Sequence, residues 1–385
     1  MSHSVVDLFA GCGGMSTGFS QAGFGVIAAF EVWDAAINCY NDNFPDHNAT
    51  KADLSNVPAT VAIIRPLKPE IIVGGPPCQD FSNAGLRKEG NRAALTESFA
   101  EIVCAVKPGF FVMENVARAR TSHSYSLARN LFKTAGYGLT ELVLDANYFG
   151  VPQHRKRFVV IGSQKQTDNF LNSNLLSQET LLPLTVREKY PDFPVDFYYR
   201  HPRSYSRRAI FTIDEPAPTI RGVNRPKPPT YKPHKNDKSL SKNITALSYK
   251  QRALLQTFPN DYIWSGTNTE KEQMIGNAVP VEFARRIASA LMSFINKQEP
   301  QKSFISWLQS GMTNESAKDV LSHLRYADRI LPFVEDDFNA EDYNKQLEKC
   351  FKRTKLSSTN QQKIRRAINL FSNYQLGIDF IRLSR

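Results

Sequence analysis

A single cysteine stands in a short turn that directly follows an apolar run. The run is Ile71-Ile72-Val73, and the turn reads Gly74-Gly75-Pro76-Pro77-Cys78-Gln79-Asp80-Phe81-Ser82. Short apolar runs bounded by turn signals are typical of buried strands, so this turn presents the Cys78 thiol at a strand end. A thiol presented in this way can act as a nucleophile, and the pattern therefore predicts covalent catalysis on a poor electrophile.

A glycine-rich loop follows the first apolar run and reads Asp7-Leu8-Phe9-Ala10-Gly11-Cys12-Gly13-Gly14. Glycines let a backbone turn sharply and approach a ligand closely, as loops that bind adenosine cofactors require. The dinucleotide pattern Gly-x-Gly-x-x-Gly would place its third glycine at Ser16, which disfavours a dinucleotide. Glu31 lies about 20 residues beyond the loop, where an acid bonds ribose hydroxyls, and Asp53 could reach the adenine amine.

Two further groups lie beside later apolar runs. Glu114 follows Phe110–Met113 and is a candidate proton donor, although a carboxylate there could also cap a helix. The basic cluster Gln153–Arg157 precedes another run, and its arginines could hold a planar substrate by paired hydrogen bonds. The same cluster could instead be a solvated face or a phosphate contact.

The elements that must position these residues are short strands alternating with helices. The apolar runs of the first 160 residues are Val5–Phe9, Val26–Phe30, Ile71–Val73, Phe110–Met113, Thr140–Leu144 and Phe158–Ile161. This alternation predicts an α/β, Rossmann-like fold, with a mostly parallel sheet covered by helices on both faces. In such sheets ligands bind outside the carboxyl ends of the strands, so the residues after each strand are expected to form the site.

Composition narrows the function class. The five cysteines among 385 residues show no zinc-type spacing, so we expect neither a metal site nor a disulfide framework. No apolar run approaches the roughly 20 residues that span a bilayer, and we expect no membrane association and a cytoplasmic protein. The net charge is +11, and residues 196–243 carry eleven Lys and Arg against four acids. Charge concentrated among aromatic residues favours a nucleic-acid partner over a merely solvated surface.

The chain divides into parts by its periodicity. From about residue 163 to 243 the sequence is rich in Pro, Tyr and Arg and has no sustained period, which is typical of a loop-rich recognition domain. Beyond residue 297 the periodicity is helical throughout. We therefore predict a catalytic domain of residues 1–162 plus 263–297, a recognition domain of residues 163–262, and a helical accessory domain of residues 298–385. The last would either dock on the recognition domain or mediate self-association.

Taken in order, these residues resemble the S-adenosylmethionine-dependent DNA (cytosine-5) methyltransferases of prokaryotic restriction-modification systems. The resemblance covers roughly residues 4–297. It rests on Asp7–Phe19, Glu31, Asp53, Gly74–Ser82, Glu114–Val116, Gln153–Arg157 and Gly276–Pro280. It implies a class I methyltransferase sheet with a small, loop-rich target-recognition domain. The helical C-terminal extension lies outside the part of the chain that the resemblance covers. One departure is Lys250-Gln251, where the family usually carries an Arg-Glu pair, so we expect weaker local salt bridging.

The resemblance also implies a mechanism. The Cys78 thiolate would add to carbon 6 of a flipped cytosine while Glu114 protonates ring nitrogen 3, after which carbon 5 takes the methyl group of S-adenosyl-L-methionine. S-adenosyl-L-homocysteine would be the product. Arg155 and Arg157 match positions that hold the base. The target base must leave the duplex, at a cost of a few kcal/mol that protein contacts repay.

Binding residues follow residue by residue from the same resemblance. The cofactor-pocket positions are Phe9, Gly11, Cys12, Gly13, Glu31, Val32, Asp53, Leu54, Pro77, Asn277 and Val279. The DNA-contacting positions are Gln79, Ser82, Arg87, Arg92, Arg221 and Arg225. Residues Phe81–Leu95 match the loop that closes over the flipped base.

The expected partner is double-stranded DNA, bound by a monomer near the nucleoid of a prokaryote. A cognate restriction endonuclease is the expected functional partner, with or without physical contact, and self-association through residues 298–385 stays open. Two other functions stay open as well. The same scaffold could methylate cytosine in tRNA, or it could be a catalytically silent DNA-binding regulator.

Overall fold

The computed structural model describes residues 2–77, 94–204, 206–241, 243–297, 304–333, 338–351, 356–378 and 380. The candidate nucleophile Cys78 and four predicted DNA contacts, Gln79, Ser82, Arg87 and Arg92, lie outside these residues. The chain forms two compact units. We call residues 1–172 with 183–292 the sheet unit, and residues 173–182 with 293–385 the helical unit. The sheet unit includes the segment expected to recognise the target except for its residues 173–182, which belong to the helical unit, and the finer boundaries at residues 162 and 262 stay predictions.

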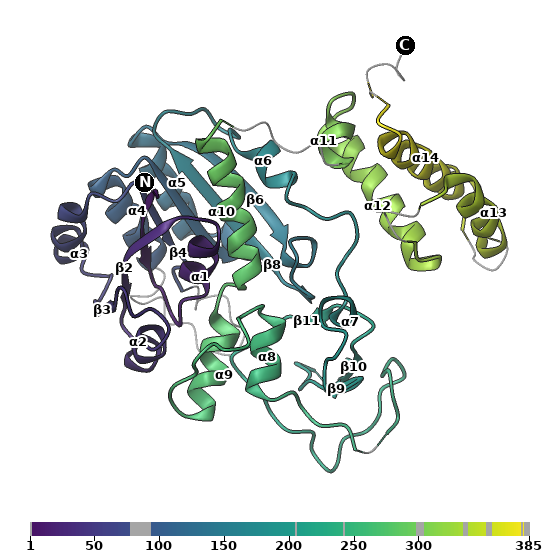
Figure 1. The fold of residues 1–385 in the computed structure, drawn as a ribbon, viewed down its shortest axis with the longest axis horizontal. Helices are drawn as coiled ribbons and strands as arrows, with labels where there is room; N and C mark the ends of the chain where they lie inside the picture. The colour runs from purple at the N-terminus through teal and green to yellow at the C-terminus, as the bar shows by residue number, and fades with distance from the viewer. Residues whose placement is uncertain are drawn as a thin grey trace. The chain divides into compact units, whose positions relative to one another are not determined.

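A seven-stranded sheet forms the core of the sheet unit, in the order β3-β2-β1-β4-β5-β8-β6 (Figure 1). The strands are β1 (Ser4–Leu8), β2 (Gly25–Glu31), β3 (Ala49–Lys51), β4 (Ile71–Gly74), β5 (Phe110–Val116), β6 (Gly138–Asp145) and β8 (Lys156–Ser163). Only β8 is antiparallel to its neighbours, β5 and β6, so the predicted mostly parallel sheet is confirmed. All six apolar runs are strands of this sheet.

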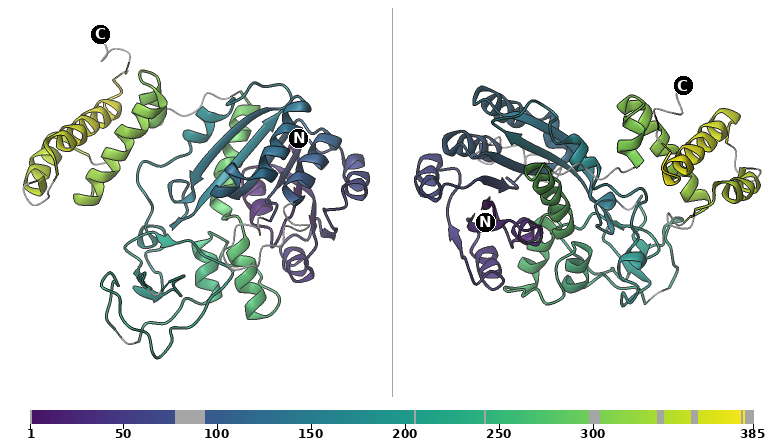
Figure 2. Two further views of the ribbon diagram at one scale, coloured as in Figure 1. Left: turned by 180° about the vertical axis from the view of Figure 1, so that it is seen from behind. Right: turned by 45° about the horizontal axis from the view of Figure 1, so that its top comes forward.

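Helices cover both faces of the sheet, which explains why its central strands are apolar at successive positions. On one face, α3 (Val57–Ile64), α4 (Ala94–Val106) and α5 (His123–Thr134) pack into a buried core with the strands. On the other face lie α1 (Gly14–Gln21), α2 (Asp34–Asn41) and α10 (Val281–Ile295). Figure 2 shows, from behind, the strands side by side with the green α10 beyond them. Residues from both ends of the unit thus build one core.

Shorter elements connect the sheet to the rest of the sheet unit. These are the 3₁₀ turns η1 (Arg65–Leu67), η2 (Ala117–Thr121) and η3 (Ala146–Tyr148), the strands β7 (Gln153–His154), β9 (Phe197–Tyr199), β10 (Ile210–Thr212) and β11 (Ala217–Pro218), and the helices α7 (Val186–Lys189), α8 (Tyr249–Leu255) and α9 (Asn268–Asn277). β9 pairs with β10, and β11 pairs with β7 beside the main sheet. The proline-rich segment is therefore mostly loop, held by two small strand pairs, as its composition predicts.

The helical unit has its own hydrophobic core. It contains the helices α6 (Asn172–Leu176), α11 (Phe304–Gln309), α12 (Asn314–Ile330), α13 (Ala340–Phe351) and α14 (Ser358–Gln375). The first residue of α6, Asn172, is still part of the sheet unit. Leu181, from the middle of the chain, is buried in this core with Leu324 and Phe371. Arg325 donates to the Leu181 carbonyl at 2.9 Å and forms an ion pair with Glu179. The unit is thus completed by a segment that lies more than a hundred residues before α11.

No helix among the described residues is long and apolar enough to cross a membrane.

Candidate active site

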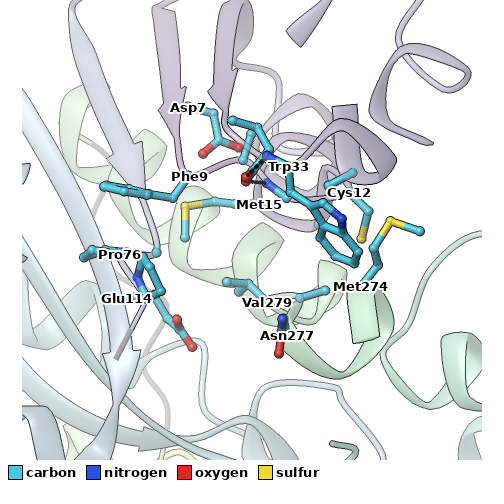
Figure 3. Close-up of a pocket in the computed structure, with 18 of the residues that line it drawn as sticks. Asp7, Phe9, Cys12, Met15, Trp33, Pro76, Glu114, Met274, Asn277 and Val279 are labelled. Atoms are coloured by element: carbon cyan, nitrogen blue, oxygen red, sulfur yellow. Dashed lines mark hydrogen bonds between the residues drawn. The ribbon is translucent and has the colours of Figure 1, made fainter. Parts of the chain in front are cut away.

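A pocket of about 380 Å³ lies at the carboxyl ends of the strands in the sheet unit (Figure 3). Ten of the eleven predicted cofactor residues line it: Phe9, Gly11, Cys12, Glu31, Val32, Asp53, Leu54, Pro77, Asn277 and Val279. The exception is Gly13, the left-handed N-cap residue of α1 (φ 89°), which does not line the pocket. Residues that are spread over some 270 positions of the chain therefore meet at the carboxyl ends of the strands, where ligands of such sheets bind.

The glycine loop has the backbone conformation that its composition predicts. Gly11 has φ 55° and Gly13 φ 89°, both in the left-handed region that favours glycine. Gly14 lies so close to the Val279 carbonyl that a Cβ atom would collide with it. The loop thus fits between β1 and the segment that follows α9, and it leaves the pocket open above its backbone.

Glu31 connects the end of β2 to the glycine loop. Its Oε2 accepts a hydrogen bond from the Gly11 N–H at 2.8 Å, and its Oε1 accepts from the N–H groups of Val32 at 2.8 Å and Trp33 at 3.0 Å. Three backbone donors fix the carboxylate, which still lines the pocket. Asp53 lines the pocket as well, and hydrogen bonds from the Ser55 hydroxyl and N–H hold the pKa of Asp53 below its usual value.

Asp7 is a buried carboxyl group on β1 that the sequence reasoning did not single out as a binding residue. Its Oδ2 accepts from the Ser16 hydroxyl at 2.6 Å, and the Tyr40 hydroxyl donates to Ser16 at 3.0 Å. Its Oδ1 is buried with no hydrogen-bond partner among the described residues, and Asp7 lines the pocket. Burial raises the pKa of Asp7 to about 7, with the Ser16 hydrogen bond opposing and Glu31 adding to the shift.

Sequence reasoning also missed other pocket residues, among them Met15, Trp33 and Met274. Trp33 follows two residues after Glu31, and an aromatic side chain just past a strand end was a usable signal. Met15 and Met274 gave no such signal, since methionine at helical spacing usually packs in a core. In Figure 3 the Trp33 ring and the Glu114 carboxylate lie on opposite sides of the pocket.

Glu114 and Arg157 form an ion pair at the pocket, with Nε of Arg157 2.7 Å from Oε1 of Glu114. Both side chains are nearly buried, with 12% of Arg157 and 10% of Glu114 exposed. Glu114 lies within β5, which continues three residues beyond the predicted apolar run, and it is paired with Val159 of β8. The alternative that Glu114 caps a helix is therefore wrong. The next residue, Asn115, donates to the Pro76 carbonyl at 3.2 Å and so ties β5 to the turn that leads to Cys78.

Arg155 is fully enclosed and holds backbone segments together. It donates to the carbonyls of Ile220 at 3.0 Å, Gly276 at 3.2 Å and Ala278 at 2.8 Å. Burial lowers the pKa of Arg155 well below its usual value, and the neighbouring Arg157 adds to this effect. Its Nε–H is buried without a partner among the described residues. The geometry suits Arg155 to positioning the loops around the pocket more than to contacting a base.

A wide basic cleft of about 1410 Å³ adjoins the pocket. Arg155, Arg157, Val116, Gly276 and Asn277 line both spaces, so the two are continuous. Of the predicted DNA contacts among the described residues, Arg221 lines the cleft and donates to the His201 carbonyl, whereas Arg225 is exposed and lies outside the cleft lining.

The motif that departs from the family pattern keeps local ionic contacts. Gln251 completes a capping box with Ser248 at the start of α8. Arg252, one residue further on, forms a buried ion pair with Glu272 of α9. Lys250 and Gln251 form no ion pair with any residue that the structure describes, so the expectation of weaker salt bridging at these two positions stays a prediction, and the local ion pair comes from the adjacent position.

Comparison with known proteins is consistent with this site. The family model described as C-5 cytosine-specific DNA methylase matches residues 3–293. The chain is 49% identical over 300 residues to the Type II methyltransferase M.HgiDI of Herpetosiphon aurantiacus, a match covering 77% of this chain and 97% of that protein. It is 49% identical over 303 residues to the Type II methyltransferase M.HindV of Haemophilus influenzae, covering 77% and 98%. Close to a quarter of this chain thus has no counterpart in either relative.

Solved structures share the fold. The Dnmt2 methyltransferase of S. pombe superposes with a TM-score of 0.58 at 17% identity, over 77% of this chain and all of that chain. A putative DNA modification methyltransferase encoded in an E. coli prophage gives a TM-score of 0.54 at 23% identity, with the same coverage. At these identities the likeness concerns the fold alone.

Proposed function

The chain belongs to the C-5 cytosine-specific DNA methylase family, and on that premise we propose that it methylates carbon 5 of one cytosine within a specific duplex DNA sequence. The observation that carries the proposal is the buried Glu114–Arg157 ion pair at a pocket that opens into a basic cleft. A base turned out of a duplex in the cleft would reach the proton donor and the pocket together.

S-adenosyl-L-methionine is the methyl donor that the pocket residues fit. Glu31 and Asp53 offer carboxylates to hydroxyl and amine donors, Trp33 and Phe9 offer aromatic surface, and the buried Asp7 Oδ1 is an unpartnered acceptor. An adenosine with a cationic amino-acid tail matches this set of acceptors and apolar surfaces. When bound, the donor supplies an electrophilic methyl group, and S-adenosyl-L-homocysteine is the product.

The catalytic roles follow from the chemistry of cytosine, whose carbon 5 is too weak a nucleophile to take a methyl group unaided. Cys78 adds to carbon 6, and Glu114 delivers a proton to nitrogen 3, so carbon 5 gains enamine character. Carbon 5 then takes the methyl group of the donor. Removal of the carbon-5 proton by a base allows β-elimination, which breaks the bond from carbon 6 to sulfur and releases Cys78. Arg157 orients the Glu114 carboxyl group and the base, and Arg155 positions the loops on which both depend.

The two relatives at 49% identity are named Type II methyltransferases, which supports a role in a restriction-modification system. Methylation of the target would then protect the DNA of a prokaryotic cell from a cognate endonuclease. A substrate of this kind places the enzyme with the chromosomal DNA in the cytoplasm.

The test is bisulfite sequencing of plasmid DNA from cells that express the protein. We expect 5-methylcytosine at one position of a defined sequence, and none with Cys78→Ala. Duplexes that carry 5-fluorocytosine at this position should trap the wild-type protein covalently, because the fluorine cannot leave as a proton does. Full activity of Cys78→Ala would contradict the proposal.

Assays of the same protein with tRNA, DNA and S-adenosyl-L-methionine test the other two functions. Methylation of tRNA but not DNA would identify a tRNA methyltransferase. DNA binding without S-adenosyl-L-methionine binding or turnover would identify a silent regulator. The intact Glu114–Arg157 pair and the open pocket favour the active enzyme over the regulator.

A further inference from the structure

The basic cleft carries far more positive charge than the protein itself neutralises. Its lining includes ten Lys and Arg residues but only two acids, Glu215 and Asp237. Both acids are already engaged. Glu215 accepts hydrogen bonds from Nη1 and Nη2 of Arg208, at 2.9 and 2.8 Å. Asp237 accepts hydrogen bonds from backbone N–H groups and from the Tyr231 hydroxyl. No acid of the cleft lining is left to balance the remaining cations, as expected of a surface that binds a polyanion.

Most arginines of the cleft are committed to internal contacts. Arg155 holds three carbonyls, Arg157 pairs with Glu114, and Arg208 pairs with Glu215. Arg200 donates to the Thr219 carbonyl at 2.8 Å, and Arg221 donates to the His201 carbonyl. Arg118 also has a partner. An arginine held in this way has fewer N–H donors and a more restricted orientation left for a base.

Arg203 and Arg207 are different. Both are exposed and line the cleft, and neither side chain has a hydrogen bond or ion pair with any residue that the structure describes. Arg203 lies close enough to Arg221 for its charge to help lower the pKa of Arg221, after the larger effect of burial. Lys235 and Lys238 line the cleft from a second loop.

Asp237 ties the second loop to the start of β10, the strand that follows Arg203 and Arg207. Asp237 Oδ1 accepts from the N–H groups of Ala209 at 2.9 Å and Ile210 at 3.0 Å, where β10 begins. Its Oδ2 accepts from the Tyr231 hydroxyl at 2.6 Å and the His234 N–H at 2.8 Å. One carboxylate therefore ties the loop of Lys235 and Lys238 to the strand that follows Arg203 and Arg207. Side chains that read a sequence need such a fixed base.

We propose that Arg203 and Arg207 read guanine edges in the major groove of the target, and that Lys235 and Lys238 bind its phosphates. The inference rests on the proposed function and names the residues that select the sequence. Free guanidinium groups match the paired O6 and N7 acceptors of guanine, whereas an ammonium group is a point charge suited to phosphate. Arg200, Arg208 and Arg221 are positioning residues for the loops.

The experiment measures equilibrium binding of the full chain to the duplex target identified by bisulfite sequencing, by fluorescence anisotropy at several salt concentrations. Each guanine of the target is replaced in turn by 7-deazaguanine, which lacks the N7 acceptor. We expect at least one replacement to weaken wild-type binding, and Arg203→Ala or Arg207→Ala to be insensitive to the same replacement. Each arginine substitution should cost roughly 5- to 150-fold in affinity for the target, corresponding to one bidentate pair.

Controls separate the possible outcomes. Arg65→Ala removes an exposed arginine outside the cleft lining and should leave binding unchanged. Lys235→Ala should weaken binding to all sequences alike and reduce the salt slope by about one. The same uniform loss in Arg203→Ala and Arg207→Ala would make them phosphate contacts and overturn the proposal, as would unchanged binding. Wild-type protein that methylates no DNA would instead contradict the proposed function, which the bisulfite experiment detects first.

Discussion

Nε of Arg157 lies 2.7 Å from Oε1 of Glu114, and the two residues belong to adjacent antiparallel strands, β5 and β8. Because both strands are central in the sheet, the ion pair is fixed by backbone pairing and not by a loop. Removing one partner would leave the other as an uncompensated, nearly buried charge, which typically costs several kcal/mol. The pair therefore gives the carboxyl group a defined direction toward the pocket.

Glu114→Gln is expected to abolish proton delivery while keeping the shape of the side chain. Methyl transfer in a single turnover should fall by roughly 10²- to 10⁴-fold, the usual contribution of a general acid. Binding of S-adenosyl-L-homocysteine, measured by calorimetry, should be unaffected. Glu101→Gln, at an exposed position of α4, is the matched control. A Glu114→Gln protein with wild-type turnover would remove Glu114 from the mechanism.

Arg155→Ala is expected to destabilise the sheet unit, because the carbonyls of Ile220, Gly276 and Ala278 would lose their donor. Unsatisfied buried acceptors cost about 1–3 kcal/mol each before water enters, so a clear fall in melting temperature should follow. Arg155→Lys should recover part of the loss, since one ammonium cannot reach all three carbonyls. If Arg155 served only to contact the base, both variants would melt like the wild type.

Much of this arrangement was predictable, because the strands are short apolar runs and parallel strands bring their following residues to one edge. Glu31, Asp53 and the glycine loop were found in this way. Arg155 and Arg157 show the limit of the method. Their neighbouring positions in a basic cluster gave no sign that one pairs with Glu114 and the other holds three backbone carbonyls. Such roles depend on which distant segments pack beside each side chain, and local sequence does not encode this.

The DNA contacts show the same limit more sharply. Arg221 and Arg225 were selected by motif position, yet Arg221 already donates to the His201 carbonyl and Arg225 lies outside the cleft lining. Whether an arginine is free depends on acceptors supplied by the fold. Composition could locate the basic segment but could not tell its engaged arginines from its free ones.

Glu31→Gln is expected to weaken cofactor binding by loosening the glycine loop. The amide keeps only one acceptor oxygen, so either the Gly11 N–H or the N–H groups of Val32 and Trp33 lose their partner. Losing a charged hydrogen bond of this kind typically costs about 1.5–3 kcal/mol, or roughly 10- to 150-fold in affinity. Calorimetric titration with S-adenosyl-L-homocysteine measures the effect. Asp34→Asn, an exposed change on α2, should bind like the wild type.

Asp7 is expected to make the sheet unit less stable as the pH rises. Its pKa is raised from 3.8 to about 7 in the folded state, so the folded protein holds a proton that the unfolded chain releases. Stability from this group is therefore lost as pH rises from about 4 to 7, by at most on the order of 4 kcal/mol. Asp7→Asn keeps an acceptor for Ser16 and removes the titration. The difference in unfolding free energy between variant and wild type, from urea titrations, should grow between about pH 4 and 7 in favour of the variant. A constant difference would show that Asp7 does not titrate in this range.

The ion pair between Arg325 and Glu179 is expected to hold residues 173–182 in the helical unit. Only 17% of Arg325 and 14% of Glu179 is exposed, so Arg325→Ala leaves a mostly buried carboxylate without its partner. We expect faster hydrogen exchange in residues 173–182 and a lower melting temperature of the helical unit. Glu179→Ala combined with Arg325→Ala should be less destabilised than the sum of the single variants, because the double variant leaves no unpaired charge. Strict additivity would contradict an interaction between the two side chains.

Removal of the C-terminal helices is expected to make the remaining chain self-associate. Leu176, Leu181 and Leu182 pack against residues of α11 to α14, so a chain ended after Lys297 would expose all three side chains. They lie on the connection between β8 and α7, within the chain that leads to the proposed DNA-reading loops. Light scattering should therefore detect oligomers of the truncated protein. Leu176→Ser, Leu181→Ser and Leu182→Ser together should restore the monomer in the truncated chain but destabilise the full-length protein. A truncated chain that is monomeric without these changes would contradict the predicted self-association.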